Sequence, residues 1–325
     1  MRSGGGGVWR RAASLAAALL ASLALAATDA LALLAGSANA RPPDSPARRV
    51  DANVPGSPWA GVGSVSVRGG TYTGTLVSRT RVITAAHVVG HAPPEDIVFN
   101  LNLTGDLSHR IPARAVYRYP GYAGFDLRNP VHDLAVIELA EPAPEDAPVY
   151  PVYRGGLAPG TVIVLVGYGA SGDGDHGANV PGHPAVKRVG LNRVDQFDAH
   201  PLTPQRPRLY RFDFDGPDAS SNRVGGTTLG NTLETSVAGG DSGSPAFVRS
   251  RRGWLIAGVN TFQWSPPGTM PGRFGSGGGG VLLAPYADWI EAVAPGAPEA
   301  VWSLDAPALE PAAPSELHSQ PSNGR

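Results

Sequence analysis

Residues able to support nucleophilic hydrolysis stand at three well-separated places in this chain of 325 residues. In the run Gly-Gly-Asp-Ser-Gly at 239–243, Ser242 lies among glycines, which let a backbone turn tightly and approach a ligand closely. Serine is a poor nucleophile until a nearby base accepts its proton. His87 follows an apolar run and is the candidate base, and Asp133 precedes another apolar run and is the candidate acid.

Taken singly, His87 and Asp133 have ordinary structural explanations. A histidine after an apolar strand is more often a packed residue than a base, and a lone acid at the start of a strand is usually a turn residue. The three residues support a chemical hypothesis only as a set, in which the serine attacks, the histidine accepts the proton and the aspartate orients the histidine.

Short strands are the elements that must position these residues. With 43 Gly and 32 Pro, the chain favours turns over long helices, and its short alternating apolar runs predict β-barrels or a sandwich. Residues 141–151 contain four prolines and are predicted to connect two all-β halves. A single helical turn is predicted at 85–89, around His87. The predicted strands are 62–67, 71–77, 81–84, 97–103, 113–119 and 135–139, then 161–168, 185–195, 209–214, 244–248, 254–262 and 280–283.

Three sequence blocks resemble the signature blocks of chymotrypsin/trypsin-like serine proteases. They read Thr-Ala-Ala-His at 84–87, His-Asp-Leu-Ala at 132–135 and Gly-Asp-Ser-Gly-Ser-Pro at 240–245. Their order, His then Asp then Ser, differs from that in subtilisins and α/β-hydrolases. The separations of 46 and 109 residues suit a family with His and Asp in one barrel and Ser in the next. The resemblance covers about residues 59–294 and implies two six-stranded antiparallel β-barrels, packed together, with a short C-terminal helix.

The resemblance implies a role for each residue of the set. Ser242 would attack the scissile carbonyl, His87 would accept its proton and deliver it to the leaving amine, and Asp133 would hold His87 in the right tautomer. The backbone N–H groups of Gly240 and Ser242 would form the oxyanion hole. The implied activity is that of a serine endopeptidase, which forms an acyl-enzyme.

Substrate preference can also be inferred from the resemblance. The floor of the primary pocket would be Ser236, which supplies no charge, whereas an aspartate there would select Arg or Lys. Thr261 would lie near Asp133, Gln263 would stand where a glycine often leaves the pocket open, and Gly280 would form the other wall. We therefore expect a neutral, apolar or small residue before the cut, at the position called P1.

Activation and origin are further expectations from the resemblance. Asp241 would pair with a newly freed N-terminus as an activation switch, and Arg48-Arg49-Val50 offers a basic cleavage site for freeing one. Family members from animals often carry a disulfide at the positions that Val88 and Tyr72 occupy here. The chain contains no cysteine, which is typical of a cysteine-free bacterial branch.

The ends of the chain differ from its centre. Residues 1–40 combine arginines, a long apolar stretch and a small-x-small sequence at 38–40, which predicts a removable signal peptide, with a membrane anchor as the alternative. Residues 41–58 are Pro- and Arg-rich and predict a propeptide or flexible lead-in. A peptidase domain follows at 59–295, with barrel one at about 59–140, barrel two at about 152–285 and a helix at about 286–294. Residues 296–325 are predicted to be a disordered Pro- and Ala-rich tail.

Composition narrows the partners. The formal net charge of −1 gives no reason to expect nucleic acid, and no metal or cofactor is expected. Asp213 and Asp215 flank Phe214 in strand-like alternation and are expected to face solvent. The protein is predicted to be a secreted or periplasmic monomer that acts on proteins or peptides. No membrane association is expected once the signal peptide is removed.

Two other classes remain as alternatives. A non-catalytic binding module could use the same fold, although such relatives usually lose a member of the triad. A serine esterase could use a Gly-Asp-Ser nucleophile, but that class carries the motif near its N-terminus and a histidine near its C-terminus. Here the motif is late, and only His318 follows it.

Overall fold

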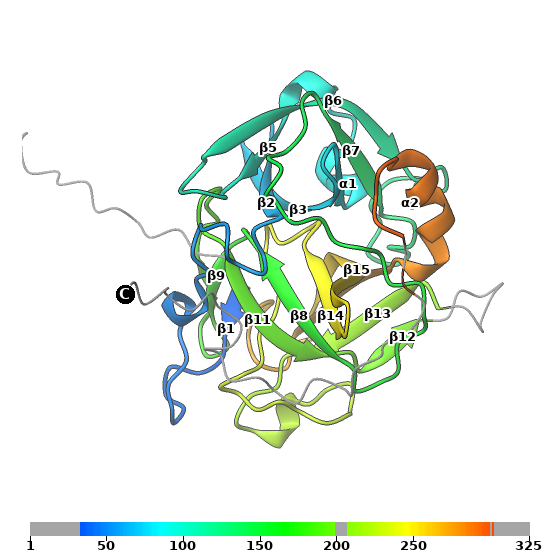
Figure 1. Cartoon of the computed structure of the whole chain (residues 1–325). Helices are drawn as coiled ribbons and strands as arrows, with labels where there is room; N and C mark the ends of the chain where they lie inside the picture. The colour runs from blue at the N-terminus through cyan, green and yellow to red at the C-terminus, as the bar shows by residue number, and fades with distance from the viewer. Residues whose placement is uncertain (1–32, 199–206, 300, 302–325) are drawn as a thin grey trace, which may run out of the picture.

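The computed structural model describes residues 33–198, 207–299 and 301, and these form two strand-rich halves, one above the other in Figure 1. Each predicted strand has a counterpart, because the alternating branched and aromatic side chains suit a pleated, half-buried surface. The predicted all-β chymotrypsin-like fold with a short C-terminal helix is confirmed. That helix, α2 (Ala287–Val293), is tied to the first half by a hydrogen bond from the Arg81 guanidinium to the Val293 carbonyl.

The first half is a closed barrel of six antiparallel strands in the order β2-β3-β4-β7-β6-β5. Fully buried apolar side chains, among them Val65, Leu76, Phe99 and Ile137, fill it. A single helical turn, α1 (Ala86–Val89), follows β4 as predicted. The strands are β2 (Val62–Val67), β3 (Gly70–Ser78), β4 (Arg81–Thr84), β5 (Ile97–Leu101), β6 (His109–Arg118) and β7 (Ala135–Leu139).

The second half is a seven-stranded antiparallel sheet in the order β11-β8-β14-β15-β16-β13-β12. Six of these strands were predicted. The seventh, β12, pairs with β13 at one edge of the sheet. The strands are β8 (Val162–Gly167), β11 (Arg188–Arg193), β12 (Gln196–Asp198), β13 (Leu209–Asp213), β14 (Pro245–Ser250), β15 (Gly253–Trp264) and β16 (Gly277–Leu282).

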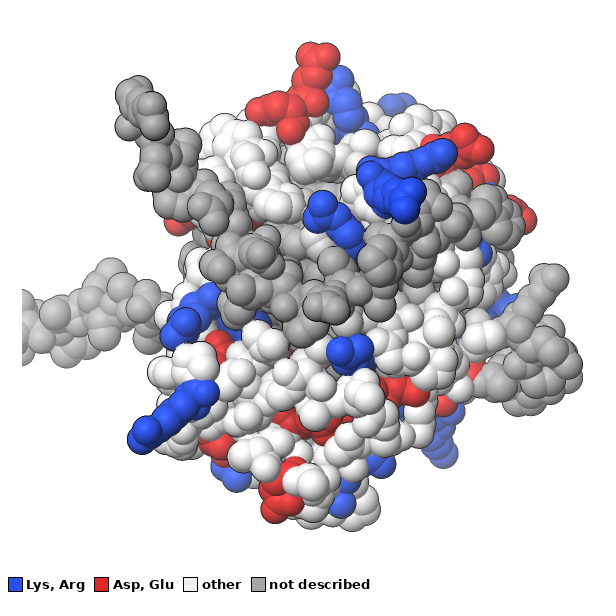
Figure 2. Space-filling view, turned by 60° about the horizontal axis from the view of Figure 1, so that its bottom comes forward, with Lys and Arg blue, Asp and Glu red and all other residues white. Residues whose placement is uncertain are grey.

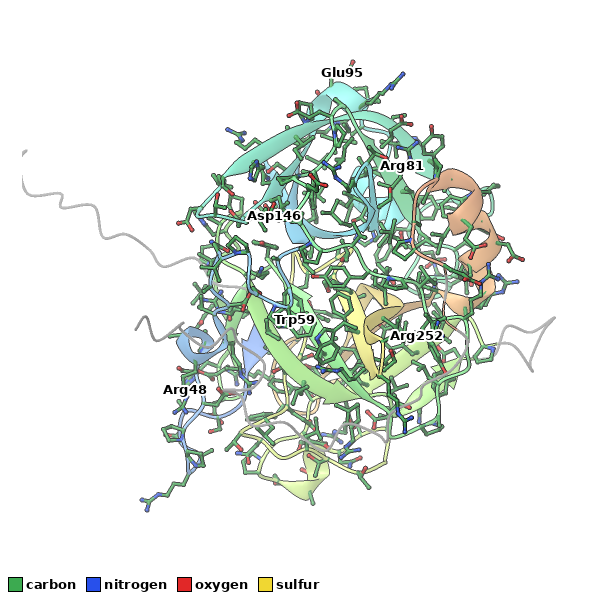
Figure 3. All side chains as sticks on the ribbon, viewed as in Figure 1. Arg48, Trp59, Arg81, Glu95, Asp146 and Arg252 are labelled. Atoms are coloured by element: carbon green, nitrogen blue, oxygen red, sulfur yellow. The ribbon has the colours of Figure 1, made fainter. Side chains whose placement is uncertain are left out.

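Trp59 lies at the junction of the two halves, near the centre of Figure 3. Its ring is fully buried and packs against Phe247 and Trp254, with ring centroids 5.2 and 4.6 Å apart. Its carbonyl accepts a hydrogen bond from the buried ammonium of Lys187, which also pairs with Asp51 at 3.1 Å. Aromatic packing on Trp59 and the buried Lys187–Asp51 ion pair thus hold the two halves together at this point.

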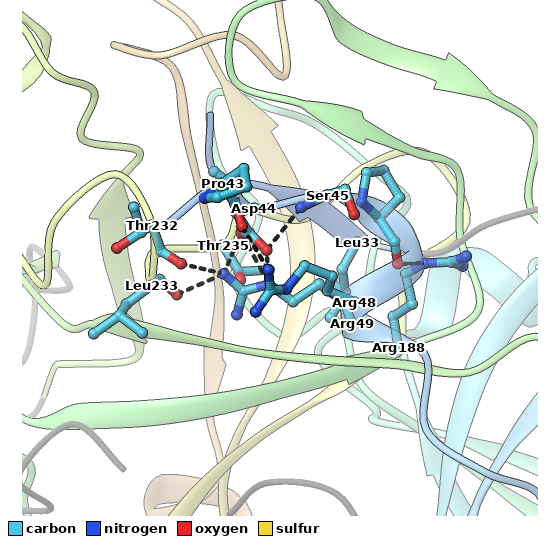
Figure 4. Close-up of polar contacts among 12 residues, drawn as sticks. Leu33, Pro43, Asp44, Ser45, Arg48, Arg49, Arg188, Thr232, Leu233 and Thr235 are labelled. Carbon is cyan, nitrogen blue, oxygen red and sulfur yellow. Dashed lines mark hydrogen bonds and ion pairs between the residues drawn. The ribbon is translucent and has the colours of Figure 1, made fainter. Parts of the chain in front are cut away.

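Residues 33–58 contain regular structure within the predicted signal peptide and the predicted propeptide or lead-in. The end of the predicted signal peptide contains β1 (Leu33–Ala35), which is fully buried and joins β9 (Ser171–Asp173) and β10 (Gly177–Val180) in a small sheet. The segment 41–58 contains a 3-10 helix, η1 (Pro46–Arg49), which ends in an arginine that forms a buried ion pair with Asp44 (Figure 4). Residues 1–32 and 302–325, which include most of both predicted terminal segments, lie outside the described residues.

Asp213 and Asp215 were also expected to face solvent, and this is wrong. They are 2% and 4% exposed, because the segment after them covers both. The backbone N–H groups of Arg223 and Val224 donate to the Asp213 carboxylate, and the N–H of Asp215 donates to the Glu234 carboxylate. The segment contains η3 (Ala219–Ser221); the other short 3-10 helices are η2 (Pro94–Asp96) and η4 (Ala284–Tyr286).

Cationic and anionic side chains are interspersed over the face of the molecule that Figure 2 shows. Among the helices of the described residues, none has the length and apolar character that a membrane crossing requires.

Candidate active site

Strand pairing in the first barrel brings His87 and Asp133 together. The end of β4 pairs with the start of β7, with Thr84 opposite Ala135. His87 lies three residues after the end of β4, on α1, and Asp133 lies two residues before β7. Both strands are buried along almost their whole length, and their antiparallel pairing sets which residues stand opposite each other. The register thus places the two side chains next to each other.

Asp133 holds His87 through two hydrogen bonds. The His87 ring nitrogen Nδ1 lies 2.6 Å from Asp133 Oδ2, and the His87 backbone N–H donates to Asp133 Oδ1 at 2.8 Å. The aspartate side chain is 1% exposed and the histidine side chain 18%. An imidazole held at Nδ1 in this way has Nε2 left as the nitrogen that can accept a proton.

A strained turn at His132 delivers Asp133 to this position. His132 has φ of 64°, a left-handed conformation that is uncommon for residues other than glycine. Its ring stacks on Tyr119, with centroids 5.1 Å apart, and its Nδ1 lies 3.1 Å from the Tyr286 hydroxyl. These contacts restrain the turn that carries Asp133. Tyr286 lies 154 residues away from His132 in the chain, so this contact could not be predicted from the sequence.

The nucleophile turn is shaped by glycines and fixed to the first barrel. Gly240 and Gly243 have φ of 94° and 86°. A Cβ on Gly243 would lie 2.1 Å from the Thr84 hydroxyl oxygen and 2.2 Å from the Thr73 carbonyl oxygen, so no side chain fits. The carbonyl of Ser242 accepts a hydrogen bond from the Thr73 N–H at 3.1 Å. Ser242 is therefore placed by both halves.

Two backbone donors in this turn are available to a ligand. Across the described ranges, the N–H groups of Gly240 and Ser242 donate to no protein acceptor, whereas the neighbouring N–H groups of Asp241 and Gly243 bond to the carbonyls of Ala238 and Asn260. Free N–H groups on a preformed turn can stabilise negative charge on a bound oxygen.

The carboxylate of Asp241 holds the turn from inside. It is fully buried and accepts hydrogen bonds from the N–H groups of Gly169 at 2.9 Å and Ala238 at 2.8 Å. Burial raises the pKa of Asp241 to about 7, against the effect of its hydrogen bonds from Ala238, Gly169 and Leu33 and of the positive charge of Arg188.

His87 and Ser242 face one cavity of about 290 Å³ at the junction of the halves. The sequence had given no sign of two of its lining residues, Phe125 and Leu127, which belong to a loop rich in glycine and proline. Phe125 packs on the His87 ring with centroids 4.7 Å apart, and both loop side chains are exposed, at 45% and 61%. The remaining lining residues are Val237, Ala238, Gly239, Asp241, Asn260, Thr261, Phe262 and Gln263.

The residues expected to form the primary pocket divide into two groups. Thr261 and Gln263 line the cavity, whereas Ser236 and Gly280 do not. Ser236 is fully buried because its backbone pairs with Leu34 of β1. A Cβ on Gly280 would meet the backbone of β15 rather than the cavity.

Thr261 and Gln263 differ in their side-chain contacts. The Thr261 hydroxyl has no hydrogen-bond partner in the described part of the chain. The Gln263 amide donates to the carbonyl of Val237 and so spans the two walls of the cavity.

In the described ranges, no three or more His, Asp or Glu side chains are grouped so that they could hold a metal ion.

Comparison with protein families agrees with this geometry. Residues 70–257 match the family model described as a trypsin-like peptidase domain, a span that includes His87, Asp133 and Ser242 and more than half of the chain. The chain therefore belongs to the trypsin-like peptidases, the trypsin/chymotrypsin-like family of proteases.

Proposed function

We propose that the protein is a serine endopeptidase with His87, Asp133 and Ser242 as its catalytic triad. One observation carries the proposal: the 2.6 Å contact of His87 Nδ1 with Asp133 lies beside a cavity that His87 shares with Ser242. A histidine oriented by a buried carboxylate is the arrangement that activates a serine hydroxyl.

The proposed reaction proceeds in two halves. Ser242 Oγ attacks the peptide carbonyl while His87 Nε2 takes its proton, and the N–H groups of Gly240 and Ser242 bind the oxyanion. His87 then protonates the leaving amine, which departs and leaves an acyl-enzyme. A water molecule attacks this ester while His87 takes its proton, and His87 then gives that proton to Ser242 Oγ as the ester bond breaks and the acid product leaves.

A neutral, small or apolar P1 residue is the preference that the cavity supports. Val237, Ala238 and Phe262 contribute apolar surface. The carboxylate of Asp241 is occupied by backbone N–H groups on the buried side of the turn. The bond from Gln263 to Val237 limits the depth available to a long side chain. A Lys or Arg side chain would lose its hydration there without gaining a counter-ion.

Apolar residues are also favoured further upstream of the cut. A second hollow of about 420 Å³ adjoins the cavity and shares Leu127, Phe262 and Gln263 with it, and its other lining residues are Arg211, Trp264, Ser265 and Pro271. The apolar side chains among them favour an apolar ligand, because contact removes their remaining exposed surface from water. We propose that the residues preceding P1 in the substrate chain bind here.

Cleavage profiling with a peptide library tests this function. Intact protein should cut after neutral residues, and Ser242→Ala should remove all cleavage. Cleavage after Arg or Lys would contradict the proposed pocket. Hydrolysis of simple esters without any peptide cleavage would favour the esterase alternative. Absence of both activities in folded protein would favour the binding module.

Export, bacterial origin and a monomeric state are also proposals. The arginines and apolar stretch before residue 33 support export by a removable leader, and the absence of cysteine supports a bacterial branch of the family. The substrates of such an enzyme are proteins or peptides outside the cytoplasm. Mass spectrometry of protein from culture medium and periplasm would establish the location.

A further inference from the structure

The second half of the molecule reaches the candidate catalytic acid through Tyr286. This buried tyrosine ends η4, and the N–H of Leu283, just before η4, donates to the carbonyl of Ala257 in β15 at 2.9 Å. Tyr286 is therefore fixed to the second half. Its hydroxyl nevertheless lies 3.1 Å from Nδ1 of His132, the residue before Asp133 in the first half.

The turn around Asp133 is tight and is held on both sides by Tyr119. The N–H of Leu134 donates to the carbonyl of His132 at 2.7 Å, which closes a three-residue turn with Asp133 at its centre. The ring of Tyr119 stacks on the His132 ring, and the N–H of Tyr119 donates to the carbonyl of Leu134 at 2.9 Å. A shift of the His132 ring or of Leu134 would therefore move the Asp133 carboxylate relative to His87.

The hydrogen bonds at the Tyr286 hydroxyl fix the direction of its bond to His132. Burial raises the pKa of Tyr286, against the lowering effects of hydrogen bonds from the Arg208 guanidinium and the His132 backbone N–H, so the hydroxyl keeps its proton. Both of these groups are donors to the oxygen. A tyrosine hydroxyl has one proton of its own to donate. That proton goes to His132 Nδ1, which is therefore the unprotonated nitrogen of the ring.

Aromatic edge contacts leave the His132 ring little freedom to move. The Tyr119 ring meets the rings of Tyr286 and Trp289 edge-on, with centroids 4.8 and 5.4 Å apart. The His132 ring also meets Tyr286 edge-on, at 5.8 Å. Such edge-to-face pairs are favourable beyond the burial of their surface. Because Trp289 belongs to α2, the C-terminal helix also packs on the ring that supports the turn.

The backbone of His132 shows that local preference does not hold this turn. Its φ of 64° is adopted readily by glycine and more often by asparagine than by most other residues. A conformation of this kind persists where the surrounding contacts determine it. The contacts of the His132 ring, rather than its backbone preference, therefore set where Asp133 points.

We propose that His132 and Tyr286 are positioning residues that hold the Asp133 carboxylate on His87 from the second half of the molecule. The Tyr286 hydroxyl donates to His132 Nδ1, the His132 ring fixes the turn, and the turn aims Asp133 at His87 Nδ1. Neither positioning residue is among the described residues that line the cavity beside Ser242. Their loss should therefore slow the chemistry without weakening substrate binding. The inference rests on the proposed serine endopeptidase function.

Three variants separate the hydroxyl, the ring and the acceptor. Tyr286→Phe removes the hydroxyl and keeps the ring, and kcat for peptide hydrolysis should fall by about 10- to 10²-fold with KM nearly unchanged, because small misplacements of catalytic groups cost up to that much. His132→Gly suits the left-handed backbone but lacks the ring, and it should lose at least as much. His132→Asn keeps an acceptor at the position of Nδ1 and tolerates the same φ, so it should retain most of kcat.

Matched controls change a histidine and a tyrosine outside this contact. His91→Asn and Tyr117→Phe alter exposed side chains and should leave kcat and KM unchanged. Combining His132→Gly with Tyr286→Phe should be no worse than His132→Gly alone, because both changes break the same contact. Full kcat in Tyr286→Phe and His132→Gly, losses confined to KM, or His132→Asn as slow as His132→Gly would each overturn the proposal.

NMR of the resting protein distinguishes this inference from the proposed function. The proton between His87 Nδ1 and Asp133 should give a low-field ¹H signal that shifts or broadens in Tyr286→Phe and is retained in His132→Asn. With ¹⁵N-labelled histidine, the signals lost in His132→Asn should include an unprotonated Nδ1. A protonated Nδ1, or a low-field signal unchanged in Tyr286→Phe, would contradict the inference. If the intact protein cleaves no peptide, the endopeptidase function fails, while these signals still decide the positioning role.

Discussion

In the first half of the molecule the candidate base and acid stand at the adjoining ends of two paired strands, whereas in the second half the candidate nucleophile stands on a glycine turn. His87 and Asp133 are positioned by β4 and β7 of a closed barrel with an apolar interior. Ser242 is positioned by hydrogen bonds to Asp241 and by contacts with Thr73 and Thr84 of the first barrel. Strand pairing in the apolar barrel thus positions His87 and Asp133, whereas hydrogen bonds to a buried carboxylate hold the turn that carries Ser242.

The distribution of buried acids follows the same division. Among described residues 59–140, Asp133 is the one acid that is fully buried, and it faces His87. Four buried acids outside that range, Asp213, Asp215, Glu234 and Asp241, belong to the second half. Ionisation of a buried carboxylate destabilises the folded protein. The stability of the second half should therefore depend on pH much more strongly than that of the first.

The largest effect should follow from removing the hydroxyl or the imidazole. Ser242→Ala and His87→Ala should each lower kcat/KM for peptide hydrolysis by about 10⁴-fold or more, because the two groups act as a unit. Their double variant should be hardly worse than either single one. Circular dichroism and Tm should stay close to those of the unchanged protein, and additive losses in the double variant would contradict a shared role.

A smaller but still large effect is expected where the turn meets the barrel. Gly243→Ala places a methyl group within 2.2 Å of two atoms of the first half, so the turn must move. We expect kcat/KM to fall by about 10²–10³-fold, as when an oxyanion donor is misplaced. The matched control is Gly156→Ala, whose added Cβ meets nothing within 4 Å. If the two variants retain equal activity, the close contact does not position Ser242.

The pH dependence of stability should come from the second half. Burial raises the pKa of Asp195 to about 8, of Glu234 to about 7 and of Asp215 to about 6. In the unfolded chain these groups titrate near pH 4. Between about pH 4 and 8 the folded protein therefore holds protons that the unfolded chain has released, and stability falls as pH rises.

Asp195→Asn tests this assignment. It keeps an acceptor for the N–H of Asp213 and removes the group with the highest of these pKa values. Tm measured from pH 5 to pH 8 should decline less steeply in the variant, by a few degrees over the range. The exposed Glu145→Gln should leave the slope unchanged. A variant slope equal to that of the unchanged protein would place the pH sensitivity elsewhere.

The smallest effect concerns selectivity. Gln263→Ala removes the side chain that spans the cavity to the carbonyl of Val237. We expect kcat/KM for substrates with a large apolar P1 residue to rise by about 10-fold relative to small ones, since a methylene or two in such a pocket is worth about that much. The control is Gln196→Ala on exposed β12. An unchanged ratio would mean that Gln263 does not limit the pocket.

Features that depend on local pattern could be predicted from the sequence. Alternating apolar residues gave the strands, and the three blocks around His87, Asp133 and Ser242 pointed to the site and the family. These signals are local because a strand must keep its register and the nucleophile turn must contain glycine at 243.

Features that depend on distant partners could not be predicted. Leu33–Ala35 reads as the end of an apolar leader, and only its pairing with Ser171–Asp173 shows it to be a core strand. Ser236 looks like a pocket floor until Leu34 is seen to cover it. Phe125 lies in a loop without periodic pattern, so nothing in the sequence places its ring on His87.

The most direct test of the triad is to map the adduct that a fluorophosphonate forms with folded protein. The account predicts a single adduct, on Ser242, and no adduct in His87→Ala. Modification of another serine, or labelling of Ser242 that is unaffected by removing His87, would contradict it.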